Sequence, residues 1–186
     1  MKIANYLVPA MLIAATALFA QSPRSNGANT QPIDEEYTRQ ILEFTTTPAF
    51  LTKFVDHLPA SDTVPTPLDI LGHIAGAADV LTYSHEVNNY MRAVADASPR
   101  VEVFHAGTSE EGREMIVVVV SNENAIANLN GYKAMSNKLA DPRTISEDEA
   151  QQLISDSLPM YWATGAMHSG ETGSPEMLME LVYRLA

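Results

Sequence analysis

Residues 101–120 read VEVFHAGTSEEGREMIVVVV and carry the strongest structural signal in the chain. The first part of this stretch alternates and is rich in β-formers, and its end is a continuous apolar run over residues 115–120. That run is too β-branched for a helix and suits a strand buried on both faces. Residues 107–112, GTSEEG, form a polar link with two glycines. Together these features predict an antiparallel β-hairpin.

Helical patterns flank the hairpin on both sides. Residues 84–97 carry apolar side chains at helical spacing and predict one helix. The polar stretch 122–159 predicts two further helices, one around residues 130–139 and one that begins at Ser146. Glu149 follows Ser146 by three residues, which is the pattern of a capping box.

A third strand and a last helix follow this crossover. Residues 160–166 are mostly apolar and predict the strand, and Ser174-Pro175-Glu176 is a strong helix start. The expected buried face of the helix consists of Met177, Leu178, Leu181, Val182 and Leu185. This order of strands and helices predicts the α/β class. We expect a three-layer α/β/α arrangement with a mixed sheet, of which only the N-terminal portion is present.

The composition is that of an acidic globular protein without thiols. The 186 residues include 11 Lys plus Arg and 23 Asp plus Glu, a formal net charge of −12, and 46% are hydrophobic. The acid excess argues against nucleic acids and anionic membranes as partners. Because the chain has no Cys, disulfides and thiol nucleophiles are excluded. Any metal must be held by His, Asp or Glu.

The N-terminus has the layout of a secretory signal peptide. Residues 1–20 combine the basic Lys2, an apolar run and the small Ala20 at a plausible cleavage point. The alternative is an uncleaved membrane anchor, for which the apolar run is marginally short. Residues 21–65 are expected to form a linker and an N-terminal extension. We therefore expect export to the periplasm or the extracellular space, without membrane association after the signal is cleaved.

His168 and Glu171 form the pattern that points most directly to chemistry. They lie three residues apart, after the predicted strand 160–166 and before the last helix. Sites in α/β proteins are commonly built from loops at the carboxyl ends of strands. An imidazole nitrogen and a carboxylate oxygen both suit zinc. Taken alone, His-x-x-Glu is a weak signal, because most such pairs are solvated surface residues.

The other candidate residues have simpler interpretations. Ser109 is not expected to be a nucleophile, because its turn joins two strands instead of a strand and a helix. Arg113 is interpreted as an ion-pair partner of the hairpin acids, and Trp162 as a core residue. Structural roles are favoured for the histidines that lack companions at ligand spacing: His57, His73, His85 and His105.

The pair His168 and Glu171 is accompanied upstream by a second motif, Gly107-x-Ser109-x-Glu111-Gly112-Arg113. In this order, with the same intervening strands, the two motifs resemble those of the zinc carboxypeptidases, the carboxypeptidase A-like metallopeptidase family. A softer similarity covers Leu81-Thr-Tyr83 and the helix that follows it. The resemblance spans residues 66–186, which are interpreted as the N-terminal part of a zinc carboxypeptidase-like catalytic domain.

The resemblance implies roles for some residues and leaves others unassigned. By this resemblance His168 and Glu171 are the first two zinc ligands. The family's third ligand, a His, its general base, a Glu, and the residues that hold the substrate's terminal carboxylate all lie downstream of this pair. No catalytic base or substrate-binding residue is therefore assigned. Because the last helix has no termination signal before Ala186, we expect an incomplete fragment that is inactive alone.

The implied activity is that of an exported zinc metallocarboxypeptidase, which hydrolyses peptide bonds by zinc-activated water. One position departs from the family pattern, because Gly170 stands where digestive-type members have an Arg that contacts substrate. Two alternatives stay open. One is a zinc amidase or deacylase acting on non-standard amides such as cell-wall peptides, and the other is a non-catalytic binding module with the same fold. The oligomeric state is not predicted.

Overall fold

The structure is a computed structural model that describes residues 31–186. The predicted signal peptide and residues 21–30 of the predicted linker lie outside the described residues. The N-terminal and helical elements before the hairpin are β1 (Ile33–Asp34), α1 (Glu35–Phe44), a 3₁₀ turn (Pro48–Phe50), β2 (Leu58–Pro59), α2 (Pro67–Leu71) and α3 (Ser84–Ala97). They are followed by β3 (Val101–Thr108), β4 (Glu114–Val120), α4 (Glu123–Ala127), α5 (Leu129–Ala140), a 3₁₀ turn (Pro142–Thr144), α6 (Glu147–Asp156) and α7 (Gly173–Leu185).

The predicted hairpin is confirmed. Strands β3 and β4 pair antiparallel, with Val101 opposite Val120 and Thr108 opposite Glu114. A register shift follows His105, and Gly107 takes a φ of 145° at that irregularity. The expectation that β4 is buried on both faces is wrong, because its residues are exposed or only partly buried.

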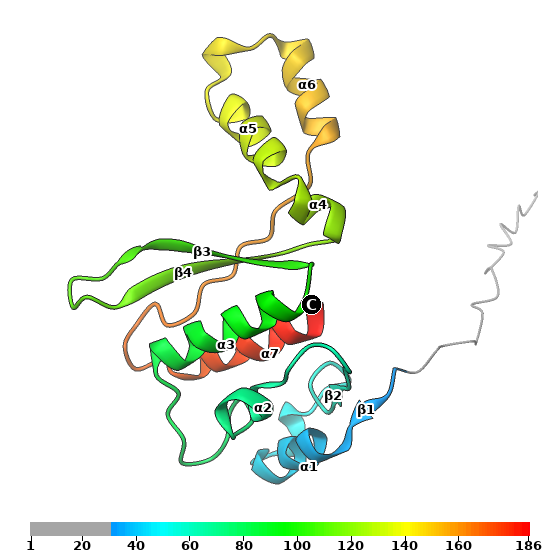
Figure 1. Cartoon of the computed structure of the whole chain (residues 1–186), viewed down its shortest axis with the longest axis vertical. Coiled ribbons are helices and arrows are strands. Elements are labelled where there is room, and N and C mark those ends of the chain that lie inside the picture. Colours follow the sequence, from blue (N-terminus) through cyan, green and yellow to red (C-terminus); the bar gives the residue numbers. More distant parts are fainter. Residues whose placement is uncertain (1–30) are drawn as a thin grey trace, which may run out of the picture. The chain divides into compact units, whose positions relative to one another are not determined.

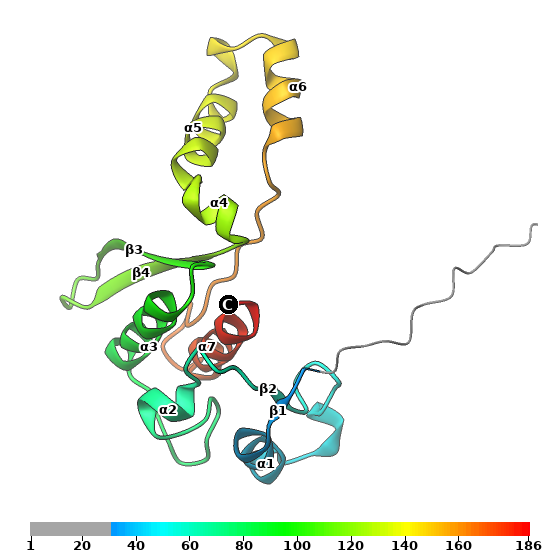
Figure 2. The same cartoon turned by 45° about the vertical axis from the view of Figure 1, so that its right-hand side comes forward.

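Helices α3 and α7 lie side by side and cover one face of the hairpin (Figures 1 and 2). The fully buried Tyr90 and Val94 of α3 meet the fully buried Met179 of α7 in one core cluster. Partly buried β-strand residues such as Val118 pack against the same cluster. The helix predicted over residues 84–97 is therefore confirmed.

The N-terminal elements join this core through Tyr37 and Leu58, which are both fully buried. Tyr37 belongs to α1, whose first turn is capped by Asp34. Its hydroxyl accepts a hydrogen bond from the Ala75 N–H at 2.9 Å. Residues on both sides of the predicted boundary at 65 and 66 thus share one core.

The crossover contains the two predicted helices. α5 and α6 lie beside each other, on the other side of the hairpin from α3 and α7 (Figures 1 and 2). Helix α6 begins after Ser146, whose hydroxyl accepts from the Glu149 N–H at 3.2 Å. This is one of the two hydrogen bonds of the predicted capping box.

The predicted third strand over residues 160–166 is wrong. This segment forms no backbone ladder with β3 or β4, and the described residues contain only two sheets, β1–β2 and β3–β4, each antiparallel. A strand needs a hydrogen-bonding partner, and without one the apolar side chains stay in solvent. Trp162 is accordingly 65% exposed, so its interpretation as a core residue is also wrong. The α/β class is confirmed, but the three-layer arrangement with a mixed sheet is not found in residues 31–186.

The last helix is confirmed, but its predicted buried face is partly wrong. Helix α7 begins at Gly173, and it buries Glu176, Met179, Val182 and Tyr183. Met177 and Leu185 of the predicted face are about half exposed. Apolar residues occur almost all round this helix, so spacing alone does not choose between its faces. Among the helices that the structure describes, none is long and apolar enough to cross a membrane.

Candidate metal centre

His168 and Glu171 lie on one turn between the extended segment and α7. The Glu171 N–H donates to the His168 carbonyl at 3.0 Å and closes the turn. His168 Nδ1 lies 2.6 Å from Glu171 Oε1, and the two side chains are 74% and 54% exposed. The turn therefore presents an imidazole nitrogen and a carboxylate to solvent at one point.

The loop that carries this turn is fastened to the start of α7. The Ala166 N–H donates to the Ser174 hydroxyl at 2.7 Å, and that hydroxyl donates to the Glu171 carbonyl at 3.1 Å. The sequence predicts Ser174 as the helix cap and Pro175 as the first helical residue, but the helix begins at Gly173 and its N-cap is Thr172, two residues earlier. A serine before Pro175 signals a helix start and carries no hint of a partner eight residues upstream, so sequence reasoning missed this contact.

His168 is not the only histidine beside a carboxylate. His57 Nδ1 lies 2.5 Å from Asp56 Oδ1, and His105 Nδ1 lies 3.2 Å from Glu114 Oε1. Structural roles are the prediction for both of these histidines. Proximity to a carboxylate therefore does not by itself single out His168.

Glu114 differs from Asp56 and Glu171, because an arginine also holds its carboxylate, whereas each of the other two contacts only its histidine within residues 31–186. Glu114 Oε1 also accepts a hydrogen bond from Arg92 Nη2 at 2.7 Å. Hydrogen bonds from His105 and then Arg92 hold the pKa of the Glu114 carboxyl below its ordinary value. A metal ion there would have to displace an arginine. Within residues 31–186, no Lys or Arg forms an ion pair with Glu171, whose carboxylate contacts only His168.

The donor set at the turn fits zinc in kind. Imidazole nitrogen and carboxylate oxygen are both zinc ligands, but a catalytic zinc takes three protein ligands. The described part of the chain contains no group of three or more His, Cys, Asp or Glu side chains that could hold a metal. The turn can therefore supply two ligands of a zinc site.

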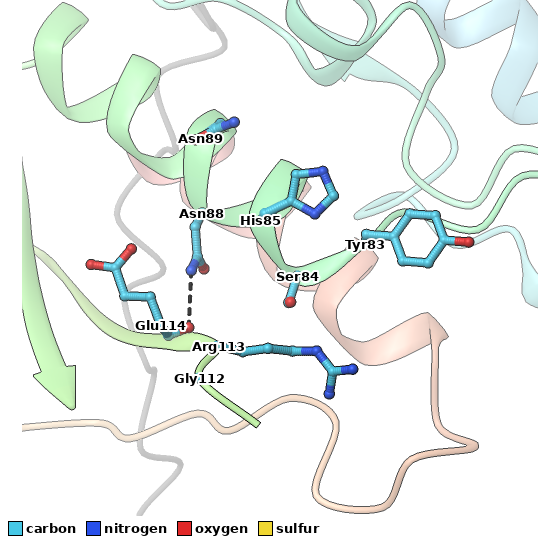
Figure 3. A pocket seen from close by; sticks show the side chains of 8 residues that line it. All are labelled: Tyr83, Ser84, His85, Asn88, Asn89, Gly112, Arg113 and Glu114. Atoms are coloured by element: carbon cyan, nitrogen blue, oxygen red, sulfur yellow. Dashed lines mark hydrogen bonds between the residues drawn. The ribbon is translucent and has the colours of Figure 1, made fainter. Parts of the chain in front are cut away.

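A separate pocket of about 300 Å³ lies between the start of α3 and the hairpin turn (Figure 3). In it the rings of Tyr83 and His85 stack with their centroids 6.0 Å apart. Asn88 Nδ2 donates to the Glu114 carbonyl at 3.1 Å and ties α3 to β4. Arg113 forms an ion pair with Glu111, as the sequence predicts. These contacts hold α3 and the hairpin together, and neither His168 nor Glu171 lines this pocket.

Comparison with known proteins adds one finding. A family model described as zinc carboxypeptidase matches residues 87–186, more than half of the chain. The match includes the hairpin, His168 and Glu171. Neither the curated proteins nor the solved structures that were compared gave a match.

Proposed function

The chain belongs to the zinc carboxypeptidase family, and from this premise we propose that it acts in the hydrolysis of peptide bonds at the C-termini of peptides. His168 and Glu171 are the zinc ligands that this chain contributes. Residues 66–186 are then the part of the catalytic domain that carries them. The family supplies the class of reaction, zinc-dependent hydrolysis, and a peptide as the class of substrate.

The observation that carries the proposal is the geometry of the turn. His168 Nδ1 and Glu171 Oε1 are 2.6 Å apart and exposed, and no cationic side chain of residues 31–186 is paired with Glu171. Because the two side chains already lie on one closed turn, an ion that binds both has little additional chain to order. The pair also lies inside the region that matches the family model.

The roles of the two side chains follow from their chemistry. His168 would bind zinc through an unprotonated ring nitrogen. Glu171 binds as a carboxylate and gives up its contact with Nδ1. When bound, zinc supplies a Lewis acid that activates water and polarises the scissile carbonyl. We place the third ligand and the general base outside residues 31–186.

The activity is tested on the protein purified from its native source. The substrates are a peptide with a free C-terminal carboxylate and the same peptide with an amidated C-terminus. We expect release of the C-terminal residue from the first peptide only, loss of that activity on chelation and its recovery with zinc. His168→Ala and Glu171→Ala abolish it, whereas His105→Ala, which breaks the other exposed His–Glu contact, leaves it in place. Activity that survives both ligand variants would contradict the proposal.

The second candidate function is zinc-dependent hydrolysis of non-standard amides such as cell-wall peptides. Gly170 favours it, because this position, directly before Glu171, lacks the Arg of the digestive-type members. A Cβ built on Gly170 meets nothing within 4 Å, so the space beside this position is open. An assay that compares cell-wall peptides with the linear peptides separates the two functions. Faster hydrolysis of the cell-wall peptides is expected only from the amidase.

We also propose that the protein is exported, with residues 1–20 as the signal peptide. The support is the basic start, the apolar run and the small residue at position 20. N-terminal sequencing of the native protein tests this. A first residue near Gln21 is the expected result, and a chain that still begins at Met1 in the cytoplasm would contradict it.

A further inference from the structure

Ser174 makes the side-chain contacts that close the loop around the proposed ligands. Its hydroxyl accepts from the Ala166 N–H at 2.7 Å and donates to the Glu171 carbonyl at 3.1 Å. One side chain therefore joins the residue two before His168, the backbone of Glu171 and the first turn of α7. Between Ala166 and Ser174, the Glu171 N–H donates a second, shorter-range hydrogen bond to the His168 carbonyl at 3.0 Å.

The backbone at Ala166 needs a contact of this kind. Its φ is +54°, in the left-handed region that disfavours a residue with a Cβ. Such a conformation persists only where the surroundings hold it. The hydrogen bond from the Ala166 N–H to the Ser174 hydroxyl is a contact that can hold it.

Gly165 brings the loop close enough for this hydrogen bond. A Cβ built on Gly165 would lie 2.9 Å from Leu178 Cδ1 and 3.2 Å from the Pro175 nitrogen. Leu178 Cδ1 is the end of a flexible side chain and can turn away, so the backbone nitrogen of Pro175 is the contact that crowds a larger residue at this position. Gly165, Ala166 and Ser174 therefore all belong to the contact between this loop and the first turn of α7.

We propose that Ser174 is a positioning residue for the metal centre, which holds the Ala166–Glu171 loop against α7 so that His168 and Glu171 are arranged before zinc arrives. The inference rests on the proposed function, because the ligand roles of His168 and Glu171 belong to it. Ser174 touches neither side chain and acts through the backbone of Glu171. Partners of this kind typically change metal affinity roughly 10–100-fold when they are removed.

The test uses the full chain, with Zn²⁺ alone as the probe and the amide NMR signals of His168 and Glu171 as the readout. Ser174→Ala removes both hydrogen bonds, and Ser174→Thr keeps the hydroxyl. Ser169→Ala is the matched control, because Ser169 lies in the same turn and its hydroxyl makes no hydrogen bond within the described residues. Hydrogen exchange at the Ala166 and Glu171 amides is measured without zinc.

We expect zinc affinity to fall about tenfold in Ser174→Ala and to stay near that of the original chain in Ser174→Thr and Ser169→Ala. We also expect the Ala166 and Glu171 amides to exchange faster only in Ser174→Ala. Gly165→Ala, which crowds the loop against the Pro175 backbone while keeping the hydroxyl, is expected to lower affinity by less than Ser174→Ala. The melting temperature of each variant shows that the core is unchanged.

Two failures are distinguishable. If zinc moves the His168 and Glu171 signals equally in the original chain and in Ser174→Ala, the positioning role is wrong and the ligand assignment stands. If zinc moves neither signal in the original chain, the ligand assignment is wrong. If the Ala166 and Glu171 amides exchange in Ser174→Ala as they do in the original chain, the positioning role is wrong whatever the zinc titration gives.

Discussion

Gly112 and Gly170 lie in turns with different backbone demands. Gly112 has a φ of +81° at the tip of the hairpin, and its N–H donates to the Ser109 carbonyl at 2.9 Å. Gly170 is not among the residues with positive φ, and a Cβ there meets nothing within 4 Å. Of these two turns, only the hairpin turn therefore requires a glycine.

Alanine substitutions at Gly112 and Gly170 are therefore expected to change stability differently. Gly112→Ala should lower the free energy of unfolding by about 1–2 kcal/mol, the usual cost of the left-handed conformation. Gly170→Ala should leave it unchanged or raise it by up to about 1 kcal/mol, because the unfolded chain loses freedom. Urea denaturation of the two variants measures both values. Equal destabilisation by both variants would show that the Gly170 turn is strained as well.

The candidate site shows what single residues reveal in a sequence. His168 and Glu171 were selected by their residue types, their spacing and the resemblance to the family, and their role as zinc ligands stays a prediction. The contact of Ser174 with Ala166 was not predictable, because it depends on how a loop returns to the first turn of a helix. The left-handed conformation of Ala166 was not predictable either, since alanine has no preference for it.

Helix α6 illustrates how one residue stabilises an element locally. The Ser146 hydroxyl accepts from the Glu149 N–H at 3.2 Å and satisfies one of the free N–H groups of the first turn. None of the described residues between 121 and 158 belongs to the main core cluster. The helix can therefore unfold without opening the core.

We predict that Ser146→Ala weakens α6 alone, by about 0.5–2 kcal/mol. Amide exchange should quicken within α6, while the amides of α3 around Tyr90 keep their protection. Ser136→Ala, an exposed position of the neighbouring helix α5, is the control and should change neither. Faster exchange in α3 as well would mean that the crossover helices unfold together with the core.

Helices and strands were predictable where the sequence pattern fits only one type of element. The hairpin and α3 follow from alternation, glycine positions and one apolar stripe. The segment 160–166 has the composition of a strand, yet a strand is defined by its partner, and composition does not supply one. Helix α7 is apolar on most sides, so the choice of its buried face depends on tertiary contacts such as that of Glu176 Oε2 with the Gly76 N–H at 2.8 Å.

Three buried tyrosines connect the parts of the core. Tyr37 OH accepts from the Ala75 N–H at 2.9 Å, Tyr90 OH donates to the Pro65 carbonyl at 3.1 Å, and Tyr183 OH donates to the Pro59 carbonyl at 2.8 Å. Each ring fills the core while its hydroxyl ties down a loop. Burial raises the pKa of Tyr183 to about 12, and it also raises the pKa values of Tyr37 and Tyr90.

These shifts predict a loss of stability at alkaline pH. An unfolded tyrosine ionises near pH 10, whereas Tyr183 in the folded chain keeps its proton up to about pH 12. Above pH 10 the unfolded state therefore binds fewer protons than the folded state, and the free energy of unfolding falls as pH rises. Below pH 10 this contribution is constant.

Urea denaturation at pH values from 8 to 11 measures this effect. Tyr183→Phe should flatten the decline, at the cost of stability at pH 8, because the Pro59 carbonyl loses its donor. Tyr161→Phe, at a position that is 92% exposed, is the control and should keep the original pH profile. A decline that is equally steep in Tyr183→Phe would remove Tyr183 from the explanation.

The central claim is that His168 and Glu171 bind zinc, and the zinc dissociation constant tests it most directly. We would measure it by competition with a chromophoric chelator for the original chain, His168→Ala, Glu171→Ala and His105→Ala. The account predicts that each ligand variant loses most of the affinity and that His105→Ala keeps it, because Arg92 already holds the carboxylate beside His105. Zinc binding that is as tight in His168→Ala as in the original chain would contradict the claim.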